Sequence, residues 1–337
     1  MRIRRLKPSH RIRNKSQKAR YSFLKIFTGS DLSRRHLPVM EIKSVNPGPV
    51  LWLTGCSHGD EVGGMVIIQE IFKRINKKGL LKGSLYAFPL MNPIGFDNVS
   101  RDITLSEEDL NRAFPGDKEG SLAQRIAYQI FNHIKETKPD LVLDLHNDWI
   151  NSIPHTLIDM DLGPEHKDVY EKTKSFARKT GFLVVLDMDD LKTALSYNLI
   201  KNKIPALTLE IGEPYVVNET DVDSGVDCIL NILSEMGMIE PIGELVKHPI
   251  LIKEPELNDK ILKFSSKPVS SSSGIIRFLS EPGDVVIKGQ PVARIYNSFG
   301  KLQENVVTLK KAVVLGHSDS SVAFPGAAVM SFGVIED

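Results

Sequence analysis

The chain has 337 residues, of which 41% are hydrophobic and 25% are charged, the composition of a water-soluble globular protein with room for two domains. Its apolar runs stay short of the ~18 residues that span a bilayer, and its basic start lacks the apolar core of a secretory signal. The two cysteines, Cys56 and Cys228, do not make a disulfide framework. We therefore expect a reducing, cytoplasmic location.

The charges are unevenly distributed along the chain. Residues 1–36 hold twelve Lys/Arg and one acid, so the remaining 301 residues carry a net charge of −10. A basic segment of this kind is either a solvated or partly ordered extension or a surface that contacts nucleic acid or anionic lipid. The acidic body argues against a nucleic-acid enzyme, and an anionic substrate would need locally placed arginines.

Strand-like and helix-like segments alternate from residue 50 to residue 237. Short apolar runs of the kind found in buried strands occupy residues 50–56, 84–91, 141–146, 182–187 and 206–211. Segments with helical periodicity occupy residues 61–78, 121–138, 165–181 and 219–237, and Ser121 is a typical N-cap. This alternation predicts an α/β domain with a mixed, largely parallel central sheet and helices on both faces.

The pattern changes after about residue 240. Short β-like runs follow, separated by Gly, Pro and Ser, with the turn sequences "EPGD" and "IKGQ". The serines at 270–273 are either a linker or the polar start of a strand. The sequence therefore predicts a basic extension (1–36), an α/β domain (37–240) and a small β domain (241–337).

The first candidate site lies in "GCSHGDEVGG", where a predicted strand is followed by a predicted helix. His58 and Glu61 are three residues apart, so on one helical turn they would share a face and could bind one metal ion. The alternative is a pair of polar residues on a surface turn, since this spacing is common by chance. The position at the carboxyl end of a strand favours a site, because open α/β sheets bind ligands there.

A second candidate ends the strand "LVLDLH", in which Asp144 and His146 point to the same face. His146 could complete a His, Glu, His set, the three-ligand pattern of catalytic zinc with a fourth position left to water. Asp144 could accept a hydrogen bond from a liganding histidine. Alternatively, these residues only end a strand, although an unpartnered buried aspartate would be costly.

Two further candidates would supply a base and substrate-binding groups. Glu210 ends the predicted strand "ALTLEI" and could take a proton from water, with Glu213 as a close competitor. In "RDITLSEEDLNRAFPG", Arg101, Asn111 and Arg112 could hold a carboxylate or stabilise an oxyanion. The alternative for this stretch is a solvated charged loop.

Over roughly residues 45–235 the chain resembles the succinylglutamate desuccinylase/aspartoacylase family, a branch of the zinc metallocarboxypeptidase-like fold. The resemblance rests on "NPGPVLWLTGCSHGDEVGG", "MNPIGFDNVSRDITLSEEDLNRAFPG", "DLVLDLHND" and "LTLEIGE", which follow the order of the family. It implies one zinc ion per chain. By this resemblance the site residues are His58, Glu61 and His146 as zinc ligands, Glu210 as general base, Arg101 polarising the scissile carbonyl, Asn111 and Arg112 gripping the substrate carboxylate, and Asp144 as the partner of a zinc histidine.

The same resemblance implies a hydrolase that cleaves the amide bond of an N-acyl amino acid or a similar small N-acyl amine. One alternative is a metallocarboxypeptidase or amidase that acts on short or cell-wall peptides, and a second is a non-catalytic binding module on the same fold. We expect a small-molecule substrate, no nucleic acid and no membrane span, with homo-oligomerisation left open. Tyr197, Tyr215 and Tyr296 remain equal candidates for a catalytic tyrosine.

The C-terminal segment "SGIIRFLSEPGDVVIKGQPVARI" looks like the half-barrel of biotinyl/lipoyl-type domains. No lysine stands in the tight-turn context in which biotin or lipoate is attached. A structural role, or a role in capping the substrate, is therefore expected rather than that of a swinging-arm carrier.

Overall fold

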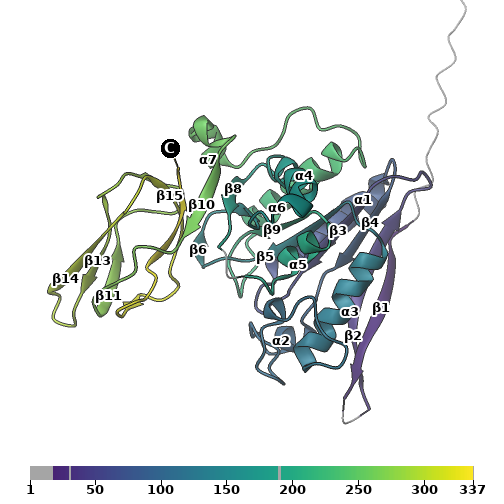
Figure 1. Ribbon diagram of the computed structural model, residues 1–337, viewed down its shortest axis with the longest axis horizontal. Helices are drawn as coiled ribbons and strands as arrows, with labels where there is room; N and C mark the ends of the chain where they lie inside the picture. The colour runs from purple at the N-terminus through teal and green to yellow at the C-terminus, as the bar shows by residue number, and fades with distance from the viewer. Residues whose placement is uncertain (1–17, 30–31, 189–190, 337) are drawn as a thin grey trace, which may run out of the picture.

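The computed structural model describes residues 18–29, 32–188 and 191–336, and most of its described strands join one large mixed sheet (Figure 1). The strand order is β1-β2-β4-β3-β5-β9-β7-β8-β10-β17-β15-β12, with β6 paired to β15. The strands are β1 (Arg20–Thr28), β2 (Arg34–Lys43), β3 (Val50–Gly55), β4 (Ser84–Phe88), β5 (Leu141–His146), β6 (Asn151–Ser152), β7 (His155–Ile158), β8 (Leu183–Leu186), β9 (Ala206–Glu210), β10 (Ile261–Ser265), β12 (Val285–Val286), β15 (Ala312–His317) and β17 (Met330–Val334).

The centre of the sheet is parallel, as predicted from its unbroken apolar strands. Strands β4, β3, β5 and β9 run parallel to one another, and all five strands expected from the sequence are present. The structure adds β7, which the sequence did not predict, between β9 and β8 and antiparallel to β9. The carboxyl ends of β3, β5 and β9 therefore meet at one edge, where ligands bind in open α/β sheets.

Helices cover both faces of the sheet, which confirms the predicted fold class. The helices are α1 (Gly63–Lys78), α2 (Pro93–Asp97), α3 (Leu122–Glu136), α4 (Lys167–Ala177), α5 (Leu195–Lys201), α6 (Glu219–Glu235) and α7 (Pro249–Lys253). Leu51 and Leu53 of β3 pack in the cluster with α1 and α6, whereas Trp52 packs with α3 and α5. Ser121 caps α3 in a reciprocal pair with Gln124. No helix in the described part of the chain is both long and apolar enough to cross a bilayer.

The C-terminal segment forms a second, four-stranded antiparallel sheet, as expected for a small β unit (Figure 1). Its order is β14-β13-β11-β16, with β11 (Gly274–Phe278), β13 (Pro291–Tyr296), β14 (Leu302–Val307) and β16 (Val322–Ala323). Other strands of this segment extend the large sheet, because β10 pairs in parallel with β8 and β17 continues from β10. A domain boundary near residue 240 therefore remains a prediction.

The structure differs from the expected basic extension over residues 20–36. Strand β1 (Arg20–Thr28) pairs antiparallel with β2, which begins at Arg34, and the two strands form one edge of the large sheet. The physical reason is that Ile26 and Leu37 are buried in the cluster against α3, so apolar burial outweighs the high local charge. The rest of the predicted extension, residues 1–17, lies outside the described residues.

Candidate metal centre and substrate cavity

The loop between β3 and α1 holds the first two predicted metal ligands. Its tight path depends on Gly59, where a Cβ atom would lie 2.0 Å from the carbonyl carbon of Gly95 in α2. The loop begins at Cys56, whose thiol donates to the carbonyl oxygen of Glu61 at 3.0 Å. Burial raises the pKa of Cys56 to about 12, so the thiol is neutral, and its sulfur is not part of the group that gathers around Glu61.

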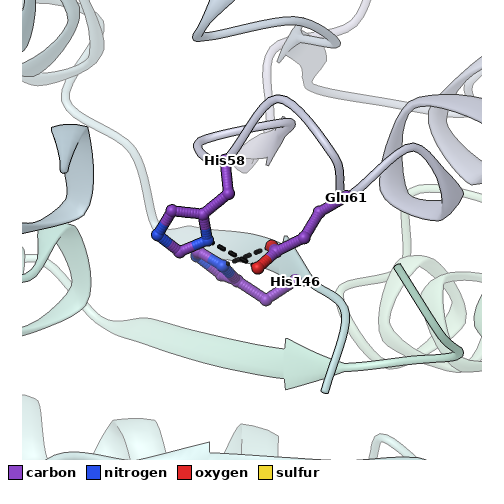
Figure 2. A group of neighbouring side chains, drawn as sticks. All are labelled: His58, Glu61 and His146. Atoms are coloured by element: carbon purple, nitrogen blue, oxygen red, sulfur yellow. Dashed lines mark hydrogen bonds and ion pairs between the residues drawn. The ribbon is translucent and has the colours of Figure 1, made fainter. Parts of the chain in front are cut away.

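His58, Glu61 and His146 come together at the carboxyl ends of β3 and β5 (Figure 2). One potential ligand atom from each side chain lies within 4.8 Å of the other two, and all three residues are buried. The Glu61 carboxylate lies between the histidines, with Oε1 2.5 Å from His58 Nδ1 and Oε2 2.8 Å from His146 Nδ1. Two imidazoles and one carboxylate form a donor set that fits a single divalent metal ion.

The charges of these side chains depend on one another. Burial alone would raise the pKa of Glu61, but His58 and His146 hold it well below its usual range. Burial alone would lower the pKa of His146, but Asp144 and Glu61 raise it well above its ordinary value. The group is therefore an ion cluster built around one carboxylate, and a metal cation would take over the role of the histidine protons.

Each of the two histidines also contacts a carboxylate other than that of Glu61. Asp144 Oδ2 lies 3.1 Å from His146 Nε2, and its other oxygen accepts a hydrogen bond from Thr54 at 2.6 Å. Asp109 Oδ1 lies 3.1 Å from His58 Nε2, a partner that the sequence analysis missed. The signal for Asp109 was available, because it opens "DLNR" and metal-binding histidines commonly donate to a carboxylate.

Three residues of the 101–112 segment, Arg101, Asp109 and Asn111, contact this cluster, whereas Thr104, Leu105 and Glu107 are exposed. Arg101 Nη2 contacts Asp109 Oδ2 at 3.1 Å, and its Nη1 lies 3.6 Å from Glu61 Oε1. Asn111 is buried in the short helix Leu110–Arg112, where its Oδ1 accepts from the backbone N–H of Leu195 at 3.0 Å. Arg112 is held by a bond from Nη1 to the Asn111 carbonyl oxygen at 3.1 Å.

A cavity of about 400 Å³ opens beside the cluster and brings the predicted residues together. Its lining includes the His58, Glu61 and His146 side chains together with Arg101, Asn111, Arg112 and Glu210, but not Asp144, which lies behind His146. It also contains acidic residues that the sequence analysis did not consider: Asp60, Asp148, Asp187 and Asp319. They were missed because they come from separate loops and no short motif links them.

The structure places Glu210 and Glu213, the two candidate bases, in different hollows. Glu210 pairs across the sheet with His146 and lines the cavity, whereas Glu213 lines a different, smaller hollow. Burial raises the pKa of Glu210 well above its ordinary value, opposed by the nearby His146 and reinforced by Asp148. Of the three candidate tyrosines, Tyr215 lines the cavity.

Comparison with known proteins agrees with this geometry. The sequence profile of the succinylglutamate desuccinylase/aspartoacylase catalytic domain matches residues 47–236. The chain belongs to this family.

The relatives described below match between 82% and 100% of this chain. The N-alpha-acetyl-L-2,4-diaminobutyric acid deacetylase of Halomonas elongata is 28% identical over 82% of this chain and 80% of its own length. A succinylglutamate desuccinylase of Silicibacter sp. TM1040 has the same fold, with a TM-score of 0.78 at 20% identity over 100% of both chains. The product-bound ectoine utilization protein EutE of Ruegeria pomeroyi gives a TM-score of 0.78 at 20% identity, covering 96% of this chain and 98% of the other.

A buried carboxyl near the cavity should make the stability of this desuccinylase/aspartoacylase-family protein depend on pH. Burial raises the pKa of Asp159 from 3.8 to about 7, with Asp187 and Asp144 reinforcing the shift and a Ser196 hydrogen bond opposing it. The native state therefore keeps a proton that the unfolded chain has lost, and stability falls as the pH rises from about 4 to about 7. The cost persists at higher pH.

Asp159→Asn should remove this cost, because an amide stays neutral and still accepts from Ser196. At pH 8 we expect its free energy of unfolding to exceed that of the wild type by ~1–4 kcal/mol, with little difference at pH 4. Urea denaturation at both pH values measures this. The exposed Asp259→Asn is the matched control, and equal stability of Asp159→Asn and wild type at pH 8 would contradict the assignment.

Proposed function

We propose that the protein is a zinc-dependent hydrolase that cleaves the amide bond of an N-acyl amino acid or a similar small N-acyl amine. The observation that carries this proposal is one cavity lined by His58, Glu61, His146 and Glu210. Membership of the desuccinylase/aspartoacylase family and the deacetylase named for the Halomonas relative support the amide bond as the target. The cavity volume of about 400 Å³ favours a small molecule over a peptide.

Zinc fits the donor set better than magnesium or calcium, which prefer all-oxygen ligands. His58, Glu61 and His146 would hold the ion, and the Asp109 and Asp144 carboxylates would orient the two imidazoles. A bound zinc ion contributes Lewis acidity, which lowers the pKa of water towards ~7 and polarises a carbonyl oxygen.

Glu210 would act as the general base and then as the general acid. Burial raises the pKa of Glu210 above that of an ordinary glutamate, which makes its carboxylate a better proton acceptor. The carboxylate accepts a proton from water as that water attacks the carbonyl carbon. The same proton then passes to the nitrogen as the C–N bond breaks.

Arg101 would stabilise the negative charge that develops on the carbonyl oxygen. Its guanidinium is positioned by Asp109 and lies near Glu61, so it is fixed beside the metal ligands before substrate arrives. A pre-positioned donor of this kind is typically worth ~3–4 kcal/mol in the transition state.

Asn111 and Arg112 would bind the substrate carboxylate, and this assignment makes a kinetic prediction. Arg112→Lys should raise KM for Nα-acetyl amino acids about tenfold or more while kcat changes little, because lysine cannot form the two parallel bonds of a guanidinium. Acetate release from a panel of these substrates measures both the proposed activity and this effect. The exposed Arg125→Lys, on α3 outside the cavity, is the control, and an unchanged KM for Arg112→Lys would reject the carboxylate assignment.

A further inference from the structure

A second cavity, of about 200 Å³, lies on the C-terminal segment. Among the residues that the structure describes, it shares no lining residue with the cavity beside the candidate metal centre. Strands β10, β17 and β15, which are neighbours in the large sheet, form its floor, and the connection from β14 to β15 forms a wall. We call this second hollow the basic cavity.

The floor of the basic cavity is largely apolar. Val334 of β17 pairs with Lys263 of β10 on one side and with Ala312 of β15 on the other. Directly opposite residues of an antiparallel ladder point to the same face of the sheet, and Phe332, two residues before Val334, points there as well. The floor therefore offers a hydrocarbon surface to the body of a ligand.

The wall of the basic cavity is fixed by Thr308. Its backbone N–H donates to the Gln290 carbonyl oxygen at 3.0 Å, and its hydroxyl donates to the Ile287 carbonyl oxygen. Leu309, the next residue, is 55% exposed and extends the apolar surface towards solvent. The bonds of Thr308 hold the backbone of this wall in place, so the cavity is formed before a ligand arrives.

The charged side chains that line the basic cavity are cations. Lys263, Lys267 and Lys310 are exposed, and their ammonium groups have no hydrogen bond or ion pair within residues 18–29, 32–188 and 191–336. No described Asp or Glu lines the cavity. Residues 37–337 carry a net charge of −10, so three cations without an acid run against the charge of this part of the chain. Like charges gathered at one hollow attract an anion.

We infer that the basic cavity binds a small amphipathic carboxylate, a molecule with one carboxylate and a short hydrocarbon or aromatic body. The lysine ammonium groups bind the carboxylate, and Phe264, Phe332 and Leu309 contact the body. The volume of about 200 Å³ lies below the ~300–1,000 Å³ of pockets for drug-sized ligands, so the body is short. A hydrophilic anion would leave the apolar floor uncovered.

Calorimetry at neutral pH with octanoate as the probe tests this inference. We expect saturable binding that is about tenfold or more tighter than the binding of two partial probes. Octanamide has the same body without the charge, and acetate has the charge without the body. Inorganic phosphate should bind as weakly as acetate. Absence of saturable octanoate binding, or equal affinities for octanoate and octanamide, would overturn the inference.

Substitutions locate the octanoate. The double variant Lys267→Gln/Lys310→Gln should weaken octanoate binding by about tenfold, because hydrogen bonds to charged groups are lost. Both side chains are exposed, so their replacement perturbs folding little, and Lys288→Gln/Lys301→Gln, with two exposed lysines outside the cavity, is the matched control. Leu309→Asn should weaken octanoate binding about fivefold without affecting acetate, since it removes only apolar contact.

Arg112→Lys separates the basic cavity from the one beside the candidate metal centre, where Arg112 is proposed to bind a carboxylate. This variant should leave the octanoate affinity within about twofold of the wild type. Octanoate binding that falls with Arg112→Lys but survives Lys267→Gln/Lys310→Gln would place the ligand in the other cavity and overturn the inference. Amide hydrolysis plays no part in these measurements, so the inference and the proposed function stand or fall separately.

Discussion

Glu210→Gln should reduce kcat by about 10³-fold or more while the protein keeps its metal. The amide is nearly the same size as the carboxylate but cannot accept the proton from the attacking water. Glu210 is not one of the three side chains that form the candidate metal centre, so the donor set remains complete. Acetate release and elemental analysis on the same preparation measure both parts of this prediction.

Glu213→Gln is the matched control for this experiment. Glu213 follows the same strand by three residues but lines a separate hollow, so its replacement should leave kcat within about twofold of the wild type. A Glu210→Gln variant with a near-normal rate would show that another group is the base. A variant that had lost its metal would instead place Glu210 among the groups that maintain the metal centre.

The second large effect is expected from the metal centre itself. His146→Ala should reduce the zinc content from about one per chain to a small fraction, because two protein ligands rarely retain zinc. Activity should fall with the metal. The mutation also leaves the buried Asp144 carboxylate without its imidazole partner, so some loss of stability should accompany the loss of zinc.

Elemental analysis before and after reconstitution with zinc measures the metal content. His166→Ala is the control, because His166 contacts the Lys201 carbonyl oxygen and does not line the cavity. Wild-type protein that takes up no zinc would reject the metal assignment and favour a non-catalytic binding module. Retention of a full equivalent by His146→Ala would mean that the ion is held by other side chains.

Much of the fold follows from local patterns in the sequence. The five apolar runs form strands and the four periodic segments form helices. A strand buried on both faces has consecutive apolar residues, whereas a helix buried on one face has apolar residues every three or four positions. The short strand His155–Ile158 was missed because four residues carry too little pattern to be distinguished from a loop. The strands at residues 20–28 and 34–43 were not predicted, because the charge of this region hid the apolar positions that pack on α3.

The sequence by itself indicated the three residues of the candidate metal centre and the candidate base Glu210. His58, Glu61, His146 and Glu210 each lie at or just after the carboxyl end of an apolar strand, and parallel strands bring such ends to one edge. Local spacing and this general rule made the four residues candidates for one site, and the family resemblance selected them.

Only the tertiary structure decided which other groups join them. Asp109 reaches His58 across 51 positions, and Asp319 is held by Ile150 across 169 positions. Contacts at such separations depend on how loops pack after the sheet has formed, and no short motif encodes them. The family resemblance and the strand ends predict the chemistry, whereas loop packing decides which charges face the substrate.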